Sequence, residues 1–235
     1  MLQKPSVAEG NVSDKPAYVR ERPPLSEEQR RSIRATREGK LETLQTVDDM
    51  VGNLLRTLGE TGRLENTYVF YLTDNGFLLG EHRLKGKWLP YEESISTPLI
   101  VRGPGVEAGA TQALTSNVDL APTIAELASA EPPHNPDGRS LTALLEGRDP
   151  AWRDAALLET RGGPAPDWTG VRTGRYSYVE YKTGEKELYD LEADPYQLEN
   201  LAGQRPKEQA ALSARLATLR GCAGDECRTA EVGKP

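Results

Sequence analysis

The chain has 235 residues, of which 37% are hydrophobic and 28% charged, and its formal net charge is -7. A chain of this length can bury one substantial core, and the composition is typical of a soluble globular protein. The acidic balance and the lack of a long basic run argue against a nucleic-acid partner, and no stretch approaches the length of a membrane-spanning helix. Residues 1–24 lack the apolar core of a signal peptide, so the sequence gives no localisation signal.

The first third of the chain predicts a polar segment followed by one long helix. Residues 1–25 are rich in proline and charge, and we expect them to form a surface connection. Ser26 followed by two glutamates predicts a helix start, and the helix should run to about Gly59. Its apolar residues recur at intervals of three and four, which predicts a stripe that packs on a sheet. The stripe contains Leu41, Leu44, Val47, Val51, Leu54, Leu55 and Leu58.

The stretch from residue 67 to 102 predicts two strands joined by a polar loop. The first strand, 68–72, is a short apolar run of the kind that is buried on both faces of an α/β sheet, and the second is 98–101. Asp74 and Asn75 directly follow the first strand, where ligands bind in open α/β sheets. Their oxygens suit a hard cation such as Ca²⁺ or Mg²⁺. The alternative is an ordinary Asp-Asn-Gly turn.

Five charged or titratable residues crowd the loop between these strands and suggest an anion site. They are Glu81, His82, Arg83, Lys85 and Lys87. The alternative for Lys87 is a solvated loop lysine. His82 could instead be a supporting hydrogen-bonding residue or a loop histidine, and the other three could be solvated or paired with one another.

The second half predicts a helix followed by a change to short strands. Ser116 or Asn117 can cap a helix over 118–128, with Val118, Leu120, Ile124 and Leu127 facing inward. A short helix is expected over 140–145. Four strands (155–159, 169–173, 176–182 and 187–189) predict an antiparallel sheet, and an amphipathic helix follows over 206–219. Trp168, Arg172 and Arg175 could line a substrate entrance, although core packing and surface ion pairs explain them equally well.

The two cysteines lie close together near the C-terminus. Cys222 and Cys227 predict a small disulfide loop, with two reduced thiols as the alternative. A disulfide would suit a secreted or periplasmic location of the intact protein.

The segment TDNGFLLGEHRLKGKWLPYEESISTPLIVRGPG resembles the second signature region of the sulfatases, in the alkaline-phosphatase-like superfamily. It is most similar to the arylsulfatase and glucosamine-6-sulfatase type, and the resemblance extends from about Val12 to the C-terminus. It implies that Asp74 and Asn75 are two ligands of an active-site calcium, with magnesium as the second option. It also implies that Lys87 is the catalytic lysine that contacts the substrate sulfate, and we place His82 beside it as a substrate-binding residue.

The resemblance implies an α/β fold in two parts. Residues 1–150 would be part of a mixed sheet flanked by helices, and residues 151–235 a small antiparallel subdomain with one helix. The implied function is hydrolysis of sulfate esters on a sulfated small molecule or carbohydrate, with a divalent metal and a formylglycine nucleophile. The alternatives are a phosphonate or phosphate ester hydrolase of the same superfamily and a non-catalytic anion-binding protein. The substrate identity and the oligomeric state stay open.

The Cys/Ser-x-Pro-x-Arg motif that yields formylglycine in sulfatases does not occur in this sequence. The early paired aspartates that complete the calcium site are also missing. We therefore expect the chain to be the C-terminal portion of a sulfatase and to be inactive on its own.

Overall fold

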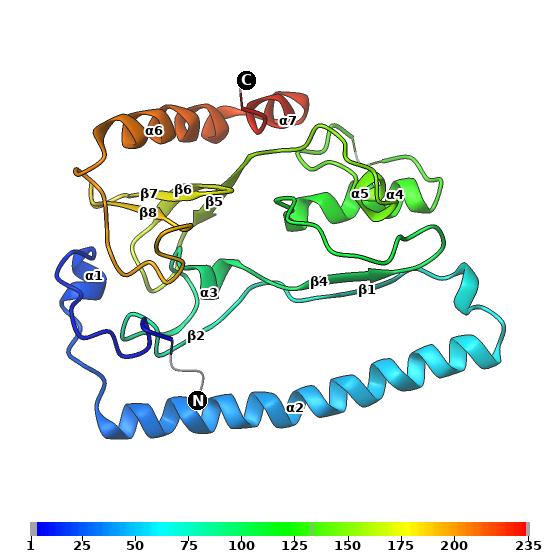
Figure 1. The fold of residues 1–235 in the computed structure, drawn as a ribbon, viewed down its shortest axis with the longest axis horizontal. Helices are drawn as coiled ribbons and strands as arrows, with labels where there is room; N and C mark the ends of the chain where they lie inside the picture. Colours follow the sequence, from blue (N-terminus) through cyan, green and yellow to red (C-terminus); the bar gives the residue numbers. More distant parts are fainter. Residues whose placement is uncertain (1–3, 133, 234–235) are drawn as a thin grey trace.

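The computed structural model describes residues 4–132 and 134–233. A long helix, α2, runs along one side of the molecule, and a four-stranded sheet covered by α6 lies on the opposite side (Figure 1). Helices and sheets of this kind confirm the predicted α/β class. No helix within the described ranges combines the length and apolar character needed to cross a membrane.

Part of the N-terminal segment is buried, which the sequence did not predict. It contains the short helix α1 (Ala17–Arg20), and Val12 and Val19 belong to the main core cluster. Lys15 is 1% exposed, and its Nζ donates a hydrogen bond to the carbonyl of Leu198 over 2.7 Å. The expected surface connection is wrong for Val12, Lys15 and Val19, which tie this segment to the C-terminal half, whereas many of its other residues are exposed.

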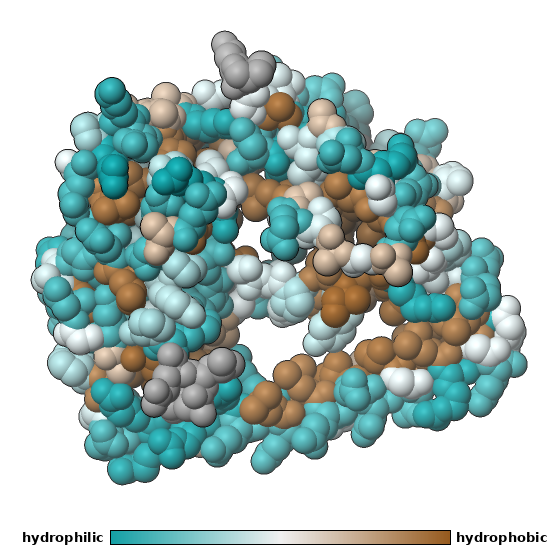
Figure 2. Space-filling view, viewed as in Figure 1, coloured by the Kyte–Doolittle hydropathy of each residue, from teal (hydrophilic) through white to brown (hydrophobic). Residues whose placement is uncertain are grey.

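Helix α2 spans Glu27–Glu60, within one residue of its predicted bounds. Ser26 and Gln29 form a capping box in which each side chain satisfies the backbone N–H of the other. The predicted packing of the apolar stripe on a sheet is not observed. Leu41, Leu44 and Leu54 of the stripe are exposed, and its other four residues are only partly buried. Apolar side chains line the edge of α2 that faces an opening in the molecule (Figure 2).

The first predicted strand pair forms a two-stranded antiparallel sheet. Strand β1 (Val69–Leu72) pairs with β4 (Leu99–Arg102) after the short 3-10 turn η1 (Leu64–Asn66). Both strands are only partly buried, because no other strand of the described part of the chain flanks them, so the expected burial on both faces is not observed. Between them lie the short strands β2 (Leu78–Leu79) and β3 (Lys85–Gly86), followed by α3 (Glu92–Ile95).

The next helical region is capped as predicted, but the residues that it buries differ from the predicted ones. Ser116 caps the 3-10 turn η2 (Asn117–Asp119), which continues into α4 (Leu120–Leu127), and α5 (Thr142–Leu145) follows. The buried residues of α4 are Pro122, Thr123 and Ala125, whereas Val118 and Ile124 are exposed. The predicted inward face is wrong for Val118 and Ile124, because the buried face carries Thr123, whose hydroxyl receives the Leu141 N–H over 2.9 Å; Leu120 and Leu127 are partly buried.

The C-terminal sheet follows the prediction closely. Its strands β5 (Ala155–Thr160), β6 (Trp168–Thr173), β7 (Tyr176–Tyr181) and β8 (Lys186–Asp190) pair antiparallel in sequence order. Helix α6 (Pro206–Gly221) packs on this sheet through Leu212, Leu216 and Leu219. The predicted disulfide between Cys222 and Cys227 is confirmed. Cys227 lies within a short unpredicted helix, α7 (Asp225–Ala230).

The main core joins both predicted parts of the chain. Val12, Leu78 and Tyr91 share one cluster with Trp168 and Tyr189. The division at residue 150 therefore stays a prediction.

Candidate active site at the end of β1

Asp74 and Asn75 lie in a tight turn directly after β1. The Asp74 carboxylate accepts the Asn75 backbone N–H over 2.9 Å, and the Asn75 amide donates to the Gly76 carbonyl over 2.8 Å. A Cβ at Gly76 would lie 2.1 Å from the carbonyl oxygen of Glu93, so only glycine fits there. The close approach of Gly76 to α3 thus fixes where the two side chains emerge from the strand end.

Lys87 comes back to this turn from the loop after β3. Its Nζ lies 2.7 Å from Asn75 Oδ1 and 4.0 Å from Asp74 Oδ2. The structure therefore brings together the three residues that the sequence singled out. Their individual roles stay predictions.

The three side chains line one cavity of about 850 Å³ between the β1 end, the 111–117 segment and the C-terminal sheet. Pockets of several hundred cubic ångströms are typical of small-molecule sites. Polar and aromatic residues form much of its wall, among them Trp88, Glu92, Ser116, Asn117, Thr160, Trp168 and Arg172. Arg175, by contrast, pairs with Asp190 outside this cavity.

His82 does not belong to the lining of the cavity. Its side chain is fully buried, its Nδ1 lies 2.7 Å from Glu9 Oε2, and its ring stacks on Tyr91 with centroids 4.0 Å apart. A direct contact with substrate does not fit this placement, because the imidazole is enclosed by protein. The alternative of a supporting hydrogen-bonding residue agrees with it.

The other charged loop residues are not paired with one another, and Glu81 and Arg83 are not fully solvated, which corrects the expectation for these two; Lys85 is exposed, as the solvated alternative predicted. Glu81 is buried and accepts the Leu79 N–H over 2.5 Å. The Arg83 guanidinium donates to three backbone carbonyls of the N-terminal segment and of the turn before α2. Lys85 donates to Thr36 on α2 over 2.7 Å. These contacts hold the loop that carries Lys87.

A buried carboxylate supports the same loop from the C-terminal sheet. Glu187 is fully buried and accepts hydrogen bonds from the hydroxyls of Tyr91, Tyr181 and Tyr189 over 2.6–2.9 Å. Burial, together with the Glu187 charge, raises the pKa of Tyr91 well above its usual range, so this hydroxyl stays a donor. Tyr91 immediately precedes Glu92, whose carboxylate pairs with Arg172 over 2.8 Å at the cavity wall.

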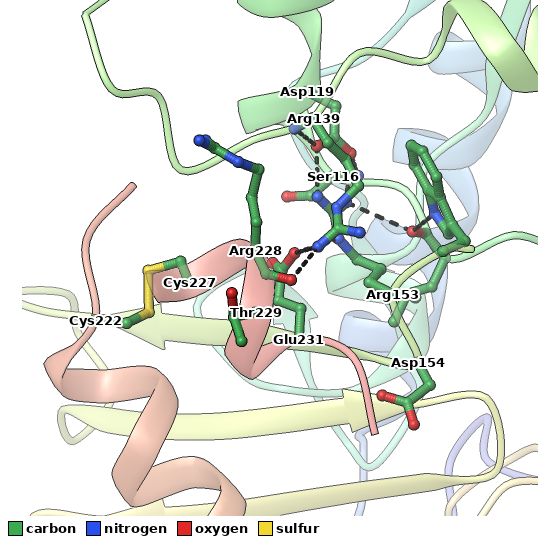
Figure 3. A network of polar contacts seen from close by, with 12 residues as sticks. Ser116, Asp119, Arg139, Arg153, Asp154, Cys222, Cys227, Arg228, Thr229 and Glu231 are labelled. Atoms are coloured by element: carbon green, nitrogen blue, oxygen red, sulfur yellow. Dashed lines mark hydrogen bonds and ion pairs between the residues drawn. A yellow bond between two sulfur atoms is a disulfide. The ribbon is translucent and has the colours of Figure 1, made fainter. Parts of the chain in front are cut away.

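An ionic network holds the η2 side of the cavity (Figure 3). The side chains of Arg153 and Asp119 are both fully buried and form a bidentate ion pair, in which the two terminal guanidinium nitrogens donate to the two carboxylate oxygens. Arg153 Nε also donates to Glu231 over 2.8 Å. Burial alone would lower the pKa of Arg153, but the bonds to the two carboxylates outweigh it and raise that pKa. The network fixes η2, where Asn117 donates to the Asp74 carbonyl over 3.1 Å.

The donor chemistry at the turn fits part of a hard-cation site. Asp74 offers an exposed carboxylate and Asn75 an amide oxygen, which are ligands that Ca²⁺ and Mg²⁺ accept. Among residues 4–132 and 134–233, no group of three or more His, Cys, Asp and Glu side chains could hold a metal ion. These two residues would therefore supply only part of a coordination shell.

Comparisons with known proteins agree with this geometry. Residues 11–130 match the family described as sulfatase, and residues 80–221 match the one described as N-sulphoglucosamine sulphohydrolase, C-terminal. An N-acetylglucosamine-6-O-sulfatase of Bacteroides thetaiotaomicron is 39% identical over 175 residues, which covers 70% of this chain and 31% of that protein. The human N-acetylglucosamine-6-sulfatase is 35% identical, with 83% of this chain and 42% of that protein covered.

Solved structures of sulfatases and of a related hydrolase are also similar to this chain. A structure in complex with its substrate D-glucosamine-2-N,6-O-disulfate superposes with a TM-score of 0.70 at 34% identity and covers 80% of this chain and 40% of that one. A phosphonate monoester hydrolase of Agrobacterium radiobacter superposes with a TM-score of 0.67 at 29% identity, covering 74% and 39%. The chain spans less than half the length of these relatives. It belongs to the sulfatase family, within the alkaline-phosphatase-like superfamily.

Proposed function

We propose that this chain provides the anion-binding side of a sulfate ester hydrolase active site. The observation that carries the proposal is the convergence of Asp74, Asn75 and Lys87 on one cavity at the end of β1. The family to which the chain belongs supports hydrolysis of a sulfate ester to an alcohol and inorganic sulfate.

Within this proposal, the Lys87 ammonium binds a sulfate oxygen and stabilises negative charge that develops on the reacting group. Asp74 and Asn75 would hold a divalent cation, with calcium the first choice and magnesium the second. When bound, such a cation would polarise the sulfate oxygens as a Lewis acid. The hydrogen bond from Lys87 to Asn75 keeps the ammonium beside these oxygens.

The proposed substrate is a sulfated carbohydrate. Two relatives named as glucosamine sulfatases and one structure solved with a sulfated glucosamine support this choice over other sulfate esters. The nucleophile would be the formylglycine implied by the resemblance, supplied by polypeptide outside this sequence. The disulfide supports an oxidising location, such as the periplasm or the extracellular space, for the intact protein.

Sulfate binding by the chain tests the anion site. We expect Lys87→Ala to weaken the binding of inorganic sulfate about tenfold, because one charge-assisted contact contributes roughly 1.5 kcal/mol. Lys85→Ala is the matched control, since Lys85 is two residues away but bonds to α2. Equal affinities of the wild type and Lys87→Ala in isothermal titration would contradict the assignment.

The purified chain should not hydrolyse sulfate esters. Turnover of p-nitrophenyl sulfate by this polypeptide alone would show that a nucleophile is present within it, which the proposal excludes.

A phosphonate ester hydrolase is the second candidate. The Agrobacterium neighbour is named for that activity, and a metal with a lysine can bind either tetrahedral anion. Parallel titrations with methyl sulfate and with the monomethyl ester of methylphosphonate, which are both singly charged at pH 7, distinguish the two, since a sulfate ester hydrolase should bind the sulfate ester more tightly.

A further inference from the structure

Trp88 is an aromatic residue on the cavity wall that the proposed function does not use. It directly follows Lys87, lines the same cavity as Asp74, and is 41% exposed. Large aromatic side chains are mostly buried on average, and apolar rings in ligand cavities usually contact the ligand. The exposed indole is therefore a candidate for binding the part of the substrate next to the sulfate.

The fold holds this indole in place from the C-terminal sheet. Gly163, in the loop between β5 and β6, lies against its six-membered ring, and a Cβ there would be 2.6 Å from Trp88 Cε3. The Trp168 indole N–H donates to the Trp88 carbonyl over 2.7 Å. Two residues from a separate part of the fold thus fix both the backbone and one side of the ring system.

The backbone of Trp88 is in an uncommon conformation. Its φ is +91°, in the left-handed region that a bulky residue rarely adopts. Such conformations persist only where the surroundings impose them, and they concentrate at ligand sites. Here the result is an indole beside an ammonium, with Lys87 Nζ 5.8 Å from the ring centroid.

We propose that Trp88 is the platform on which the pyranose ring bearing the sulfate stacks. This inference rests on the proposed function, because it places the sulfate at Lys87. The apolar C–H face of a sugar would pack on the indole, and its hydroxyls would meet polar wall residues such as Asn117 and Thr160. A cavity of about 850 Å³ has room for a sugar beside the sulfate.

The test compares two sulfate esters that differ in the group next to the sulfate. Glucosamine 6-sulfate and methyl sulfate are titrated into the chain, and binding is followed by the indole N–H signals in ¹H–¹⁵N spectra. The chain has three tryptophans, and Trp88→Phe identifies the signal of Trp88. Covering on the order of 60 Å² of apolar sugar surface corresponds to about a tenfold gain in affinity for the sugar ester.

We expect Trp88→Ala to reduce the ratio of the two affinities from about ten to about one, and Trp88→Phe to give an intermediate ratio. Tyr71→Ala is the matched control, because Tyr71 is an exposed aromatic residue on β1 outside the cavity; it should leave the ratio unchanged. A circular dichroism melt checks that each variant is folded.

Three results would overturn the platform: an affinity ratio near one in the wild type, an unchanged ratio in Trp88→Ala, or a Trp88 indole signal that does not shift when the sugar ester is added. If methyl sulfate still binds in these cases, the anion site is upheld. If neither ester binds the wild-type chain, the proposed function and the platform both fail.

Discussion

The buried Arg153–Asp119 pair makes a strong prediction about stability. Both side chains are fully buried, so Asp119→Asn would leave the Arg153 guanidinium without its bidentate carboxylate. Breaking one partner of a buried pair costs about 3–5 kcal/mol, because the remaining charge is desolvated without compensation. The second carboxylate, Glu231, remains 2.8 Å from Arg153 Nε, so we expect the lower end, about 3 kcal/mol.

Urea unfolding of the wild type and Asp119→Asn, followed by circular dichroism, measures this loss of unfolding free energy. Glu146→Gln is the matched control, because Glu146 pairs with Arg148 on the surface, where such pairs contribute at most about 1 kcal/mol. The double variant Asp119→Asn with Arg153→Met should be less destabilised than the sum of the single variants by about 2 kcal/mol, since no uncompensated guanidinium remains. A loss below about 1 kcal/mol in Asp119→Asn, or strict additivity in the double variant, would refute the reasoning.

Three further changes test the framework around the site. Glu180→Gln should lower the unfolding free energy at pH 7 by about 2 kcal/mol. Burial acts to raise the pKa of Glu180, but hydrogen bonds from Tyr178, Ser213 and Lys186 lower it to about 2 from an ordinary 4.5, and solvent screening at this partly exposed carboxylate reduces the corresponding free energy. The stabilisation is present above pH 4.5 and is lost as the pH falls towards 2, so wild type and variant should converge in acid denaturation. His82→Ala should lower the unfolding free energy by about 2–4 kcal/mol, because it removes a hydrogen-bond partner of the buried Glu9 carboxylate and the stack on Tyr91. An unchanged midpoint of urea unfolding would show that His82 does not stabilise the fold. Leu44→Glu on the exposed stripe of α2 should change the unfolding free energy by less than about 0.5 kcal/mol, and a larger loss would mean that the stripe is covered in solution.

The elements that sequence patterns predicted well are those whose partners are close in the chain. The C-terminal strands pair with their sequence neighbours, and the helix after Ser26 starts with a cap whose groups are three residues apart. The turn at Asp74 is likewise local, since its hydrogen bonds join adjacent residues. Local rules of turn and cap chemistry determine such features, so the sequence contains them directly.

The failed predictions concern residues whose partners are far away in sequence. The apolar residues of the α2 stripe recur with the period of a helix that packs on another element. This period does not identify the element that covers the stripe, and in this chain the stripe is largely uncovered. Lys15 lies in a segment that was expected at the surface. It is instead buried, and it donates a hydrogen bond to Leu198, which is 183 residues away in the sequence. Periodicity and composition describe a segment's own surface, whereas burial depends on the segments that the fold places against it.

The same distinction explains why the sequence singled out three residues that converge on one cavity but missed the residues that support them. Asp74, Asn75 and Lys87 lie within 14 consecutive positions, so one motif contains them all. Their support comes from elsewhere: Glu9 reaches the loop across 73 residues, and Glu187 reaches Tyr91 across 96. Each of these buried carboxylates holds a residue of the loop that carries Lys87. Since the position of an ammonium at a binding site is only as well defined as its supporting contacts, a change at Glu187 should disturb anion binding even though Glu187 touches no part of the cavity.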